Sequence, residues 1–317
     1  MAPEFTEFHD ELRSVACDVL SKDPVVEWQA LVEAGWVGLE VPEQFGGAGA
    51  TFAETAVICE EMGRAASTNS YLGSAVLAVG TLNALQPSAT RDQLLADVAS
   101  GAARVAVALE SWQFVPDAEG ATRVLVIASG AVAVARLPAI PQPVLDETRR
   151  LATVSANAAV GSEVLRFDGD PEAAVRRLRD RAAVAIACDS LGLSEAMLSA
   201  TVAYVKVRQQ FGRPIGSFQA VKHACADMQV HIAVTRQLVR AAIESVVHGR
   251  DDGAASMAKS YACTAAVDIA GKAMQLHGGI GYTWESGIHV YLKRAALNRS
   301  LFGSPAVHRK ELAKRYV

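Results

Sequence analysis

The chain has 317 residues, 51% of them hydrophobic and 20% charged, which is enough apolar sequence to bury a large core. Its formal net charge of -4 argues against a broad nucleic-acid-binding face. The five cysteines are scattered without a CxxC pair, and the seven histidines show no metal-ligand spacing. We therefore expect a reduced intracellular protein without a metal site.

Residues 1–103 are predicted to form a helical N-terminal domain. The first ten residues lack the basic and apolar blocks of a signal peptide, so we expect a soluble, cytoplasmic protein. One helical face is predicted from apolar side chains at three- and four-residue steps: Phe5, Phe8, Leu12, Val15 and Val19. Helix starts and stops are predicted from caps and glycines: Asp23-Pro24 to Gly35, Thr51 with Glu54 to about Ala66, and Thr90 with Gln93 to Gly101.

Residues 104–170 change to a β-branched, apolar pattern and are predicted to form a small β domain. The expected strands are 104–109, 123–128, 131–137 and 161–167. Ser129-Gly130 is the expected hairpin turn between the second and third strands. The most apolar run of the chain, residues 124–137, is interrupted by a glycine and an arginine and is too short to span a membrane.

From residue 171 to 317 the pattern returns to long helices. Gly249 ends a helix whose apolar side chains keep helical spacing: Val221, Cys225, Met228, Ile232, Val239, Ala242 and Val246. Asp251 or Asp252 is the expected cap of the next helix, which stops at Gly278-Gly279. Ser304-Pro305 begins a last helix. The order of elements predicts an α+β fold that is predominantly α.

Three stretches resemble the acyl-CoA dehydrogenase family, in the family's order. They are WQALVEAGWVGLEVPEQFGGAGATFAETAVICEEMGRA at residues 28–65, RQQFGRPIGSFQAVKHACADM at 208–228 and QLHGGIGYT at 275–283. With the helices between them they cover nearly all of both helical portions. The resemblance implies a helical N-terminal domain, a middle β domain and a C-terminal four-helix bundle.

In this family, an arginine motif and a glutamine–glycine loop reach across a dimer interface to hold FAD. An arginine fork suits a pyrophosphate because it bonds two oxygens at once, and glycines let the backbone approach the ligand. By resemblance, the residues with these roles here are Arg208, Gln210, Phe211, Phe218, Gln219, Gln275, Gly278 and Gly279. His277 lies inside the loop and is expected to pack rather than to catalyse.

The sequence departs from the family at the catalytic base. Family members use a glutamate to remove the α-proton of a thioester while the flavin accepts hydride. The residue that matches this glutamate is Phe302, which cannot take a proton. At the alternative base position of some members the chain has Arg181-Ala182-Ala183, with Asp180 adjacent. We therefore expect no catalytic residue in this chain.

The middle domain is also shorter than in full-length relatives. It lacks their flavin- and thioester-binding segment, of which Glu110-Ser111-Trp112 is the nearest trace. Together with the missing base, this resembles the short subunit of actinobacterial heterotetrameric (α₂β₂) acyl-CoA dehydrogenases that act on steroid side-chain CoA thioesters. The expected partners are a full-length catalytic subunit, an acyl-CoA substrate and an electron-transfer flavoprotein, with FAD shared across the interface.

Two alternatives remain open from the sequence. The chain could be a self-sufficient homomeric dehydrogenase that uses Asp180 or another base, and activity of the purified chain would select this alternative. It could also be a structural subunit that only stabilises a partner. A partner that holds FAD equally well alone would select the scaffold.

Overall fold

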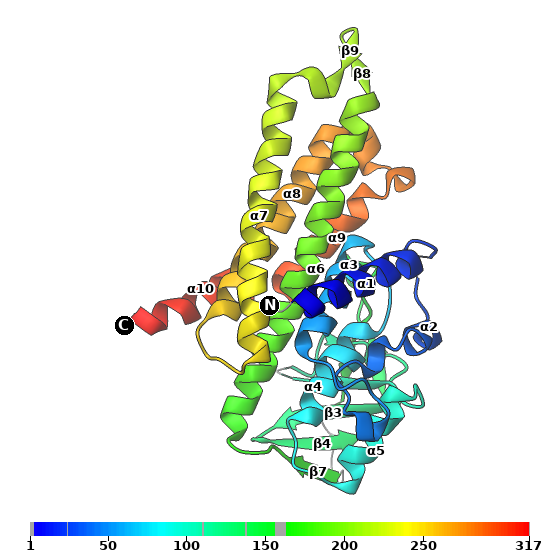
Figure 1. Ribbon diagram of the computed structural model, residues 1–317, viewed down its shortest axis with the longest axis vertical. Coiled ribbons are helices and arrows are strands. Elements are labelled where there is room, and N and C mark those ends of the chain that lie inside the picture. Colours follow the sequence, from blue (N-terminus) through cyan, green and yellow to red (C-terminus); the bar gives the residue numbers. More distant parts are fainter. Residues whose placement is uncertain (1–2, 24, 110, 137, 156–162, 317) are drawn as a thin grey trace.

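The computed structural model describes residues 3–23, 25–109, 111–136, 138–155 and 163–316. Helices dominate, and the short strands gather in the middle of the chain, so the predicted α+β, predominantly α fold is confirmed. Four residues with a predicted role lie outside the described ranges: Pro24, Glu110, Leu137 and Gly161. Figure 1 shows long helices running the length of the molecule, with the N-terminal helices and the sheets beside their lower half.

The described residues of the N-terminal part form eight short or medium helices. They are α1 (Pro3–Leu20), α2 (Trp28–Glu33), the 3₁₀ turns Trp36–Gly38 and Glu43–Phe45, α3 (Phe52–Arg64), the π-helix Leu72–Ala78, α4 (Val79–Asn83) and α5 (Ala89–Ala99). The predicted capping box is confirmed at α3, where the Thr51 side chain and Glu54 cap each other's backbone. The capping box predicted at Thr90 and Gln93 is wrong. Ser88 caps α5 instead, and the Thr90 hydroxyl donates a hydrogen bond to the Glu163 carboxylate at 2.7 Å.

The face predicted for the first helix is only partly right. Ala16 and Leu20 are buried, but Phe8 and Val15 are nearly half exposed. The helix is rotated because polar side chains occupy its contact with α3. His9 bonds Glu54 at 2.7 Å and Arg13 bonds Glu60 at 2.8 Å. The spacing of hydrophobic residues cannot predict such polar contacts between two helices.

Two sheets make up the middle part. The first has the order β1 (Val105–Ala108), β3 (Arg123–Ala128), β4 (Ala131–Ala135) and β7 (Glu163–Arg166), and the second has the order β2 (Val115–Pro116), β6 (Leu151–Val154) and β5 (Ala139–Pro141). β1 and β3 are parallel, while β3, β4 and β7 pair antiparallel. The predicted turn is confirmed: Ser129 and Gly130 both have positive φ, as a two-residue hairpin of this kind requires.

Side chains of the first sheet alternate between two cores. Val105 and Val107 of β1 join the main core with the helices, whereas Ala106 and Ala108 pack with the second sheet. The first sheet therefore lies between the helices and the second sheet.

The C-terminal part is a bundle of long helices. It comprises α6 (Pro171–Val207), the hairpin β8 (Gln209–Gln210) and β9 (Arg213–Pro214), the 3₁₀ turn Ile215–Ser217, α7 (Gln219–Val247), α8 (Ala254–His277), the turns Gly278–Tyr282 and Trp284–Ser286, α9 (Ile288–Ser300), α10 (Pro305–Ala313) and the turn Lys314–Tyr316. In Figure 1 the upper part of α6–α8 stands clear of the sheets, and the β8–β9 hairpin lies at its far end.

The helix α6 links all parts of the molecule. It is long and apolar enough to cross a membrane, but 78% of its most apolar window is buried within the protein, which is typical of a core helix. It meets α3 at two glycines. A Cβ at Gly63 would lie 1.9 Å from the Asp189 carbonyl oxygen, and one at Gly192 would lie 1.8 Å from the Glu60 carbonyl oxygen. Larger residues would force the two backbones apart.

Candidate functional site

The predicted arginine motif lies at the far end of the bundle. Arg208 is the C-cap of α6, and Gln210 and Phe211 follow in the β8–β9 hairpin. The hairpin is closed by the Ile215 amide, which donates to the Arg208 carbonyl at 2.8 Å. Phe211 takes a positive φ of 54° at the turn, and its side chain is 90% exposed. The hairpin therefore presents its predicted residues to the outside.

Phe218 and Gln219 follow where α7 begins. The rings of Phe218 and Phe211 meet edge to face with their centroids 6.1 Å apart. The Arg213 guanidinium lies 4.1 Å from the centre of the Phe218 ring, a cation–π contact. Sequence reasoning missed Arg213, although it lies inside the quoted RQQFGRPI motif. The hairpin and the segment that leads into α7 thus carry two exposed arginines and two phenylalanines in edge-to-face contact.

The glutamine–glycine loop lies at the same end of the bundle. The ring of His277, in the last turn of α8, stacks on Tyr204 of α6 with centroids 4.5 Å apart, and its Nδ1 bonds the Ala273 carbonyl at 2.8 Å. This buried contact fixes the ends of α6 and α8 together, as a packing role predicts. Gly278 and Gly279 follow directly and are exposed.

The backbone explains the first of these glycines but not the second. Gly278 has a φ of 63°, which favours glycine. Gly279 has an ordinary φ, and a Cβ there would meet nothing within 4 Å. The same is true of Gly271, two turns earlier on α8, where a helix-interior glycine costs about 1 kcal/mol relative to alanine. Spacing places Gly271 and Gln275 on one face of α8, and Gly279 follows in the turn after the helix has ended at His277.

The same end exposes large apolar side chains, which we call the tip surface together with the hairpin. Its apolar members are Val207, Phe211, Ile280, Tyr282 and Trp284. Trp284 is 71% exposed and contacts His289 edge to face at 4.6 Å. Residues 206–219 contain Lys206, Arg208 and Arg213 and no acidic residue. The hairpin part of the tip surface is therefore cationic, and the tip surface as a whole is aromatic and exposed.

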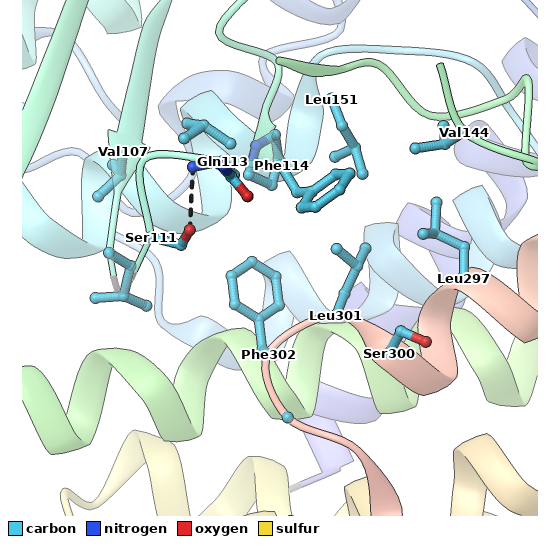
Figure 2. Close-up of a pocket in the computed structure, with 14 residues that line it drawn as sticks. Val107, Ser111, Gln113, Phe114, Val144, Leu151, Leu297, Ser300, Leu301 and Phe302 are labelled. Carbon is cyan, nitrogen blue, oxygen red and sulfur yellow. Dashed lines mark hydrogen bonds between the residues drawn. The ribbon is translucent and has the colours of Figure 1, made fainter. Parts of the chain in front are cut away.

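The position that matches the family's base lies in a different place. Phe302 follows α9 and lines a cavity of about 380 Å³ between the end of that helix and the two sheets. Figure 2 shows the rings of Phe302 and Phe114 projecting into this cavity from opposite walls. We call it the cleft; its walls are Val107, Leu109, Ser111, Gln113, Phe114, Val115, Pro116, Val144, Leu151, Leu297, Ser300, Leu301, Phe302 and Gly303.

No acidic or basic side chain is among the residues that line the cleft in the described part of the chain. Asp180 lies elsewhere, beside Arg177 and Ser245 in a separate cavity of about 20 Å³. Burial, with repulsion from Asp251, raises the pKa of Asp180 to about 6. Arg181, at the alternative base position, is buried and ion-paired with Glu40.

The turn that carries Phe302 is held by groups that no sequence pattern singled out. The Lys259 ammonium donates to the carbonyls of Asn298 at 2.9 Å and Gly303 at 3.0 Å. His308 bonds the Phe302 carbonyl through Nε2 at 2.9 Å, and its Nδ1 lies 3.0 Å from the Ser256 hydroxyl. Burial lowers the pKa of Lys259. These bonds hold Phe302 at a positive φ of 53°.

A buried ion cluster fixes the opposite wall. Asp189 of α6 pairs with Arg294 of α9 at 2.6 Å and with Arg149 at 2.9 Å. Arg149 belongs to the loop between β5 and β6, which supplies Val144 to the cleft. Burial alone would raise the pKa of Asp189, but Arg149 and Arg294 lower it to about 2. The cluster therefore ties the second sheet to the bundle.

Among the described residues, no three histidine, cysteine, aspartate or glutamate side chains gather closely enough to hold a metal ion. The candidate site therefore consists of the tip surface and the cleft, which lie on separate parts of the molecule.

Comparison with known proteins agrees with the fold. The sequence matches the family descriptions "Acyl-CoA dehydrogenase, N-terminal domain" over residues 4–102 and "Acyl-CoA dehydrogenase, C-terminal domain" over residues 173–317. Acyl-CoA dehydrogenase IpdE2 of Mycobacterium tuberculosis is 37% identical over 88% of this chain and 82% of its own. Acyl-CoA dehydrogenase IpdE2 of Mycolicibacterium smegmatis is 35% identical over 93% and 89%.

A solved structure extends the similarity to three dimensions. The protein described as the Tcur3481-Tcur3483 steroid ACAD superimposes with a TM-score of 0.88 and 26% identity, over 98% of this chain and 97% of that one. The C-terminal family match contains the tip surface and the cleft wall at residues 297–303, whereas the other cleft walls, at residues 107–116, 144 and 151, lie between the two family matches. The chain belongs to the acyl-CoA dehydrogenase family.

Proposed function

We propose that this chain is the non-catalytic subunit of an FAD-dependent acyl-CoA dehydrogenase complex. The complex would remove the α-proton of an acyl-CoA thioester and pass the β-hydrogen as hydride to FAD. The observation that carries the proposal is Phe302. A benzyl side chain occupies the family's base position, in a cleft whose described lining has no group that accepts a proton.

The tip surface has the chemistry that FAD requires. Arg208 would hold the pyrophosphate, and Arg213 adds a second cation on the same hairpin. The side-chain amides of Gln210, Gln219 and Gln275 supply neutral hydrogen-bond groups. Phe211 and Phe218 offer aromatic faces, and Gly278 and Gly279 offer backbone without side chains. FAD, when bound there, would supply the hydride acceptor of the reaction.

The supporting argument for a contact across an interface is steric. Gly279 and Gly271 have open space where a Cβ would stand, so no contact within the described part of the chain requires glycine at either position. A glycine without an internal reason is accounted for by a second molecule that approaches the backbone closely. The exposed Phe211 and Trp284 fit the same explanation, because aromatic side chains are enriched in protein interfaces.

The proposed partner is a full-length acyl-CoA dehydrogenase subunit that supplies the glutamate, the main flavin pocket and most of the thioester site. Two copies of each chain would form an α₂β₂ heterotetramer in the cytoplasm. An electron-transfer flavoprotein would reoxidise the FAD. A steroid side-chain CoA thioester is the proposed substrate, because the similar Tcur3481-Tcur3483 protein is described as a steroid ACAD.

One observation favours the homomeric alternative. A carboxyl group with a pKa of about 6, such as Asp180, is suited to act as a general base. Its cavity of about 20 Å³, however, leaves no room for a thioester, and its lining residues are not those of the cleft. Turnover of an acyl-CoA by the purified chain alone, lost on Asp180→Asn, would favour the homomeric enzyme.

Co-expression with the proposed full-length partner subunit tests the proposal directly. We expect a yellow complex with about one FAD per heterodimer. Each heterodimer would have only one complete FAD site, formed by the main flavin pocket of the partner and the tip surface of this chain. The chain expressed alone should retain little FAD and show no dehydrogenase activity. A visible spectrum and an activity assay on the same preparations measure both. A partner that is equally yellow and active alone would support the scaffold alternative instead.

The Arg208→Ala variant tests the cross-interface contact. Loss of a charged hydrogen bond to the pyrophosphate should weaken FAD binding by about 1.5–3 kcal/mol, or roughly 10- to 150-fold. FAD release on dilution of the complex measures the change. Arg240→Ala is the matched control, because Arg240 is an exposed arginine roughly 30 Å along α7 from the tip surface. Equal FAD retention in both variants would contradict the assigned role of Arg208.

A further inference from the structure

We propose that two copies of this chain pair through the outer face of α7, with the two α7 helices antiparallel. The residues that make up the outer face of α7 are Ala226, Val230, Ala233, Val234, Gln237 and Ala241. The contact does not involve FAD, so the inference goes beyond the proposed function and does not rest on it. In the proposed α₂β₂ heterotetramer, the same contact would join the two heterodimers.

The outer face of α7 points away from the rest of the bundle. Its residues follow one another at steps of three and four, which places them on one side of the helix, and all of them are exposed. The helix packs on α6 and α8, and its buried side chains, among them Met228, Ile232 and Val239, lie on the opposite side. Figure 1 shows the upper part of α7 at the edge of the bundle.

The composition of this face is not explained by the stability of the helix itself. Val230 is 61% exposed and Val234 is 39% exposed, yet a β-branched side chain loses rotamer freedom in a helix and favours it less than alanine does. Single exposed apolar residues are ordinary, but this face carries no charge over about four turns. Charged residues such as Asp227 and Arg240 lie only at its flanks. An uncharged face between charged flanks is typical of a helix that packs on another helix.

The order of residues along the face selects a second copy as the partner. The face is symmetric about the point between Ala233 and Val234, with Ala226 as far from this point as Ala241, and Val230 as far as Gln237. A two-fold axis at this point would place each of these residues opposite its counterpart on the other copy. Such a self-complementary patch is what an interface between identical chains requires.

The charges at the ends of the face select the antiparallel orientation. Lys222 and Glu244 are exposed and lie nearly equally far from the central point, on either side of it. In an antiparallel pair, Lys222 of one copy approaches Glu244 of the second copy, and the axis repeats the contact. A parallel pair would instead set lysine against lysine and glutamate against glutamate. Opposite charges at the rim fix orientation, while the apolar centre supplies affinity.

Cysteine cross-linking tests the register on the full chain alone and on the co-purified complex. All variants carry Cys17→Ser, which removes the exposed native thiol. Ala233→Cys lies beside the proposed axis and should give a disulfide-linked dimer of this chain when copper phenanthroline is added. Ala226→Cys alone and Ala241→Cys alone should not, because each thiol lies roughly 22 Å along the helix from its own copy. A mixture of these two variants should form the linked dimer.

Three results of the cross-linking would overturn the proposal. The first is no more linked dimer from Ala233→Cys than from the Cys17→Ser background. The second is a link from Ala233→Cys to the full-length subunit rather than to a second copy. The third is self-linking of Ala226→Cys as strong as that of Ala233→Cys, which would indicate a parallel pair. Linked dimers are separated on a denaturing gel without reductant.

Sedimentation equilibrium of the chain alone provides a second measurement. Ala233→Glu sets two carboxylates against each other at the axis and should raise the dissociation constant of the pair at least roughly tenfold. Ala306→Glu is the matched control, since Ala306 is an exposed alanine in the first turn of α10, where a glutamate suits the helix dipole. Equal self-association of the two variants would contradict the proposal. The flavin absorbance of the complex reports the proposed function separately.

Discussion

The tip surface and the cleft differ in how the chain's own fold uses their residues. At the tip surface, Arg208 and Gly279 are exposed, and Gly279 meets no neighbour that would explain a glycine there. In the cleft, Phe302 is fixed by buried groups, and the walls are tied by Asp189. The contrast teaches that residues unexplained by internal packing point to a second molecule. It also predicts that changes at the tip should spare stability, whereas changes behind the cleft should not.

The largest effect on stability is expected from Asp189→Asn. The change leaves Arg149 and Arg294 buried without their counter-charge, which should lower the free energy of unfolding by about 3–5 kcal/mol. Urea unfolding followed by circular dichroism measures it. Asp268→Asn, at an exposed position of α8, is the control and should change little. Equal stability of the two variants would show that the cluster does not hold the cleft wall.

The same carboxyl group gives the unaltered chain a pH dependence. The pKa of Asp189 is about 2 in the fold and about 3.9 in an unfolded chain, so its contribution is complete above pH 4. The contribution is lost as the pH falls from about 4 towards 2. Asp189→Asn should lack this pH-dependent contribution. The difference in the free energy of unfolding between the unaltered chain and Asp189→Asn should therefore become smaller as the pH falls over that interval, which urea unfolding at a series of pH values measures.

An intermediate effect, on assembly alone, is expected from Gly271→Leu. Leucine favours a helix by about 0.8 kcal/mol over glycine, and open space surrounds the site, so the chain's own stability should not fall. A partner packed against this face would be displaced, weakening the complex by about 1–3 kcal/mol, or roughly 5- to 150-fold. Analytical ultracentrifugation of the two-subunit mixture measures the change. The smaller substitution Gly271→Ala should weaken assembly of the complex less. If Gly271→Leu assembled as tightly as the unaltered chain, this face of α8 would not be part of the interface.

The smallest effect is expected from Asp180→Asn. Burial and Asp251 raise the pKa of Asp180 to about 6, so the ionised carboxylate costs stability that the protonated one does not. The cost is absent below pH 4 and complete above pH 6. The variant should be more stable at pH 8 by less than about 1 kcal/mol, because the group is partly exposed, and equal at pH 4. Thermal melts at both pH values check this, and a loss of stability at pH 8 would contradict it.

Much of the fold follows from local patterns. Two strands, β3 and β4, were predictable because β-branched residues flank a two-residue turn, at Val124 to Val126 and Val132 to Val134. The strands β2, β5 and β6 were missed because each has only two to four residues and is defined by its partners rather than by its own periodicity. The Ser88 cap was missed because Thr90 offered the same chemistry two residues later.

The site was less accessible from sequence. The roles of Arg208, Gln275 and Gly279 came from a family resemblance and stay predictions, since they concern a second molecule. Lys259 gave no signal, because a lysine among small residues in a helix normally lies in solvent. Only the tertiary fold brings the Gly303 carbonyl to its ammonium group. Long-range contacts of this kind leave no trace in spacing.

The crossing of α3 and α6 has a consequence for engineering. Gly63 and Gly192 belong to the two separately matched family segments, yet each leaves room for the other helix's backbone. Chimeras that join the first hundred residues of one relative to the last helices of another must therefore inherit both glycines together. A fragment cut between them would expose the main core. The two family-matched segments are therefore not expected to fold independently of each other.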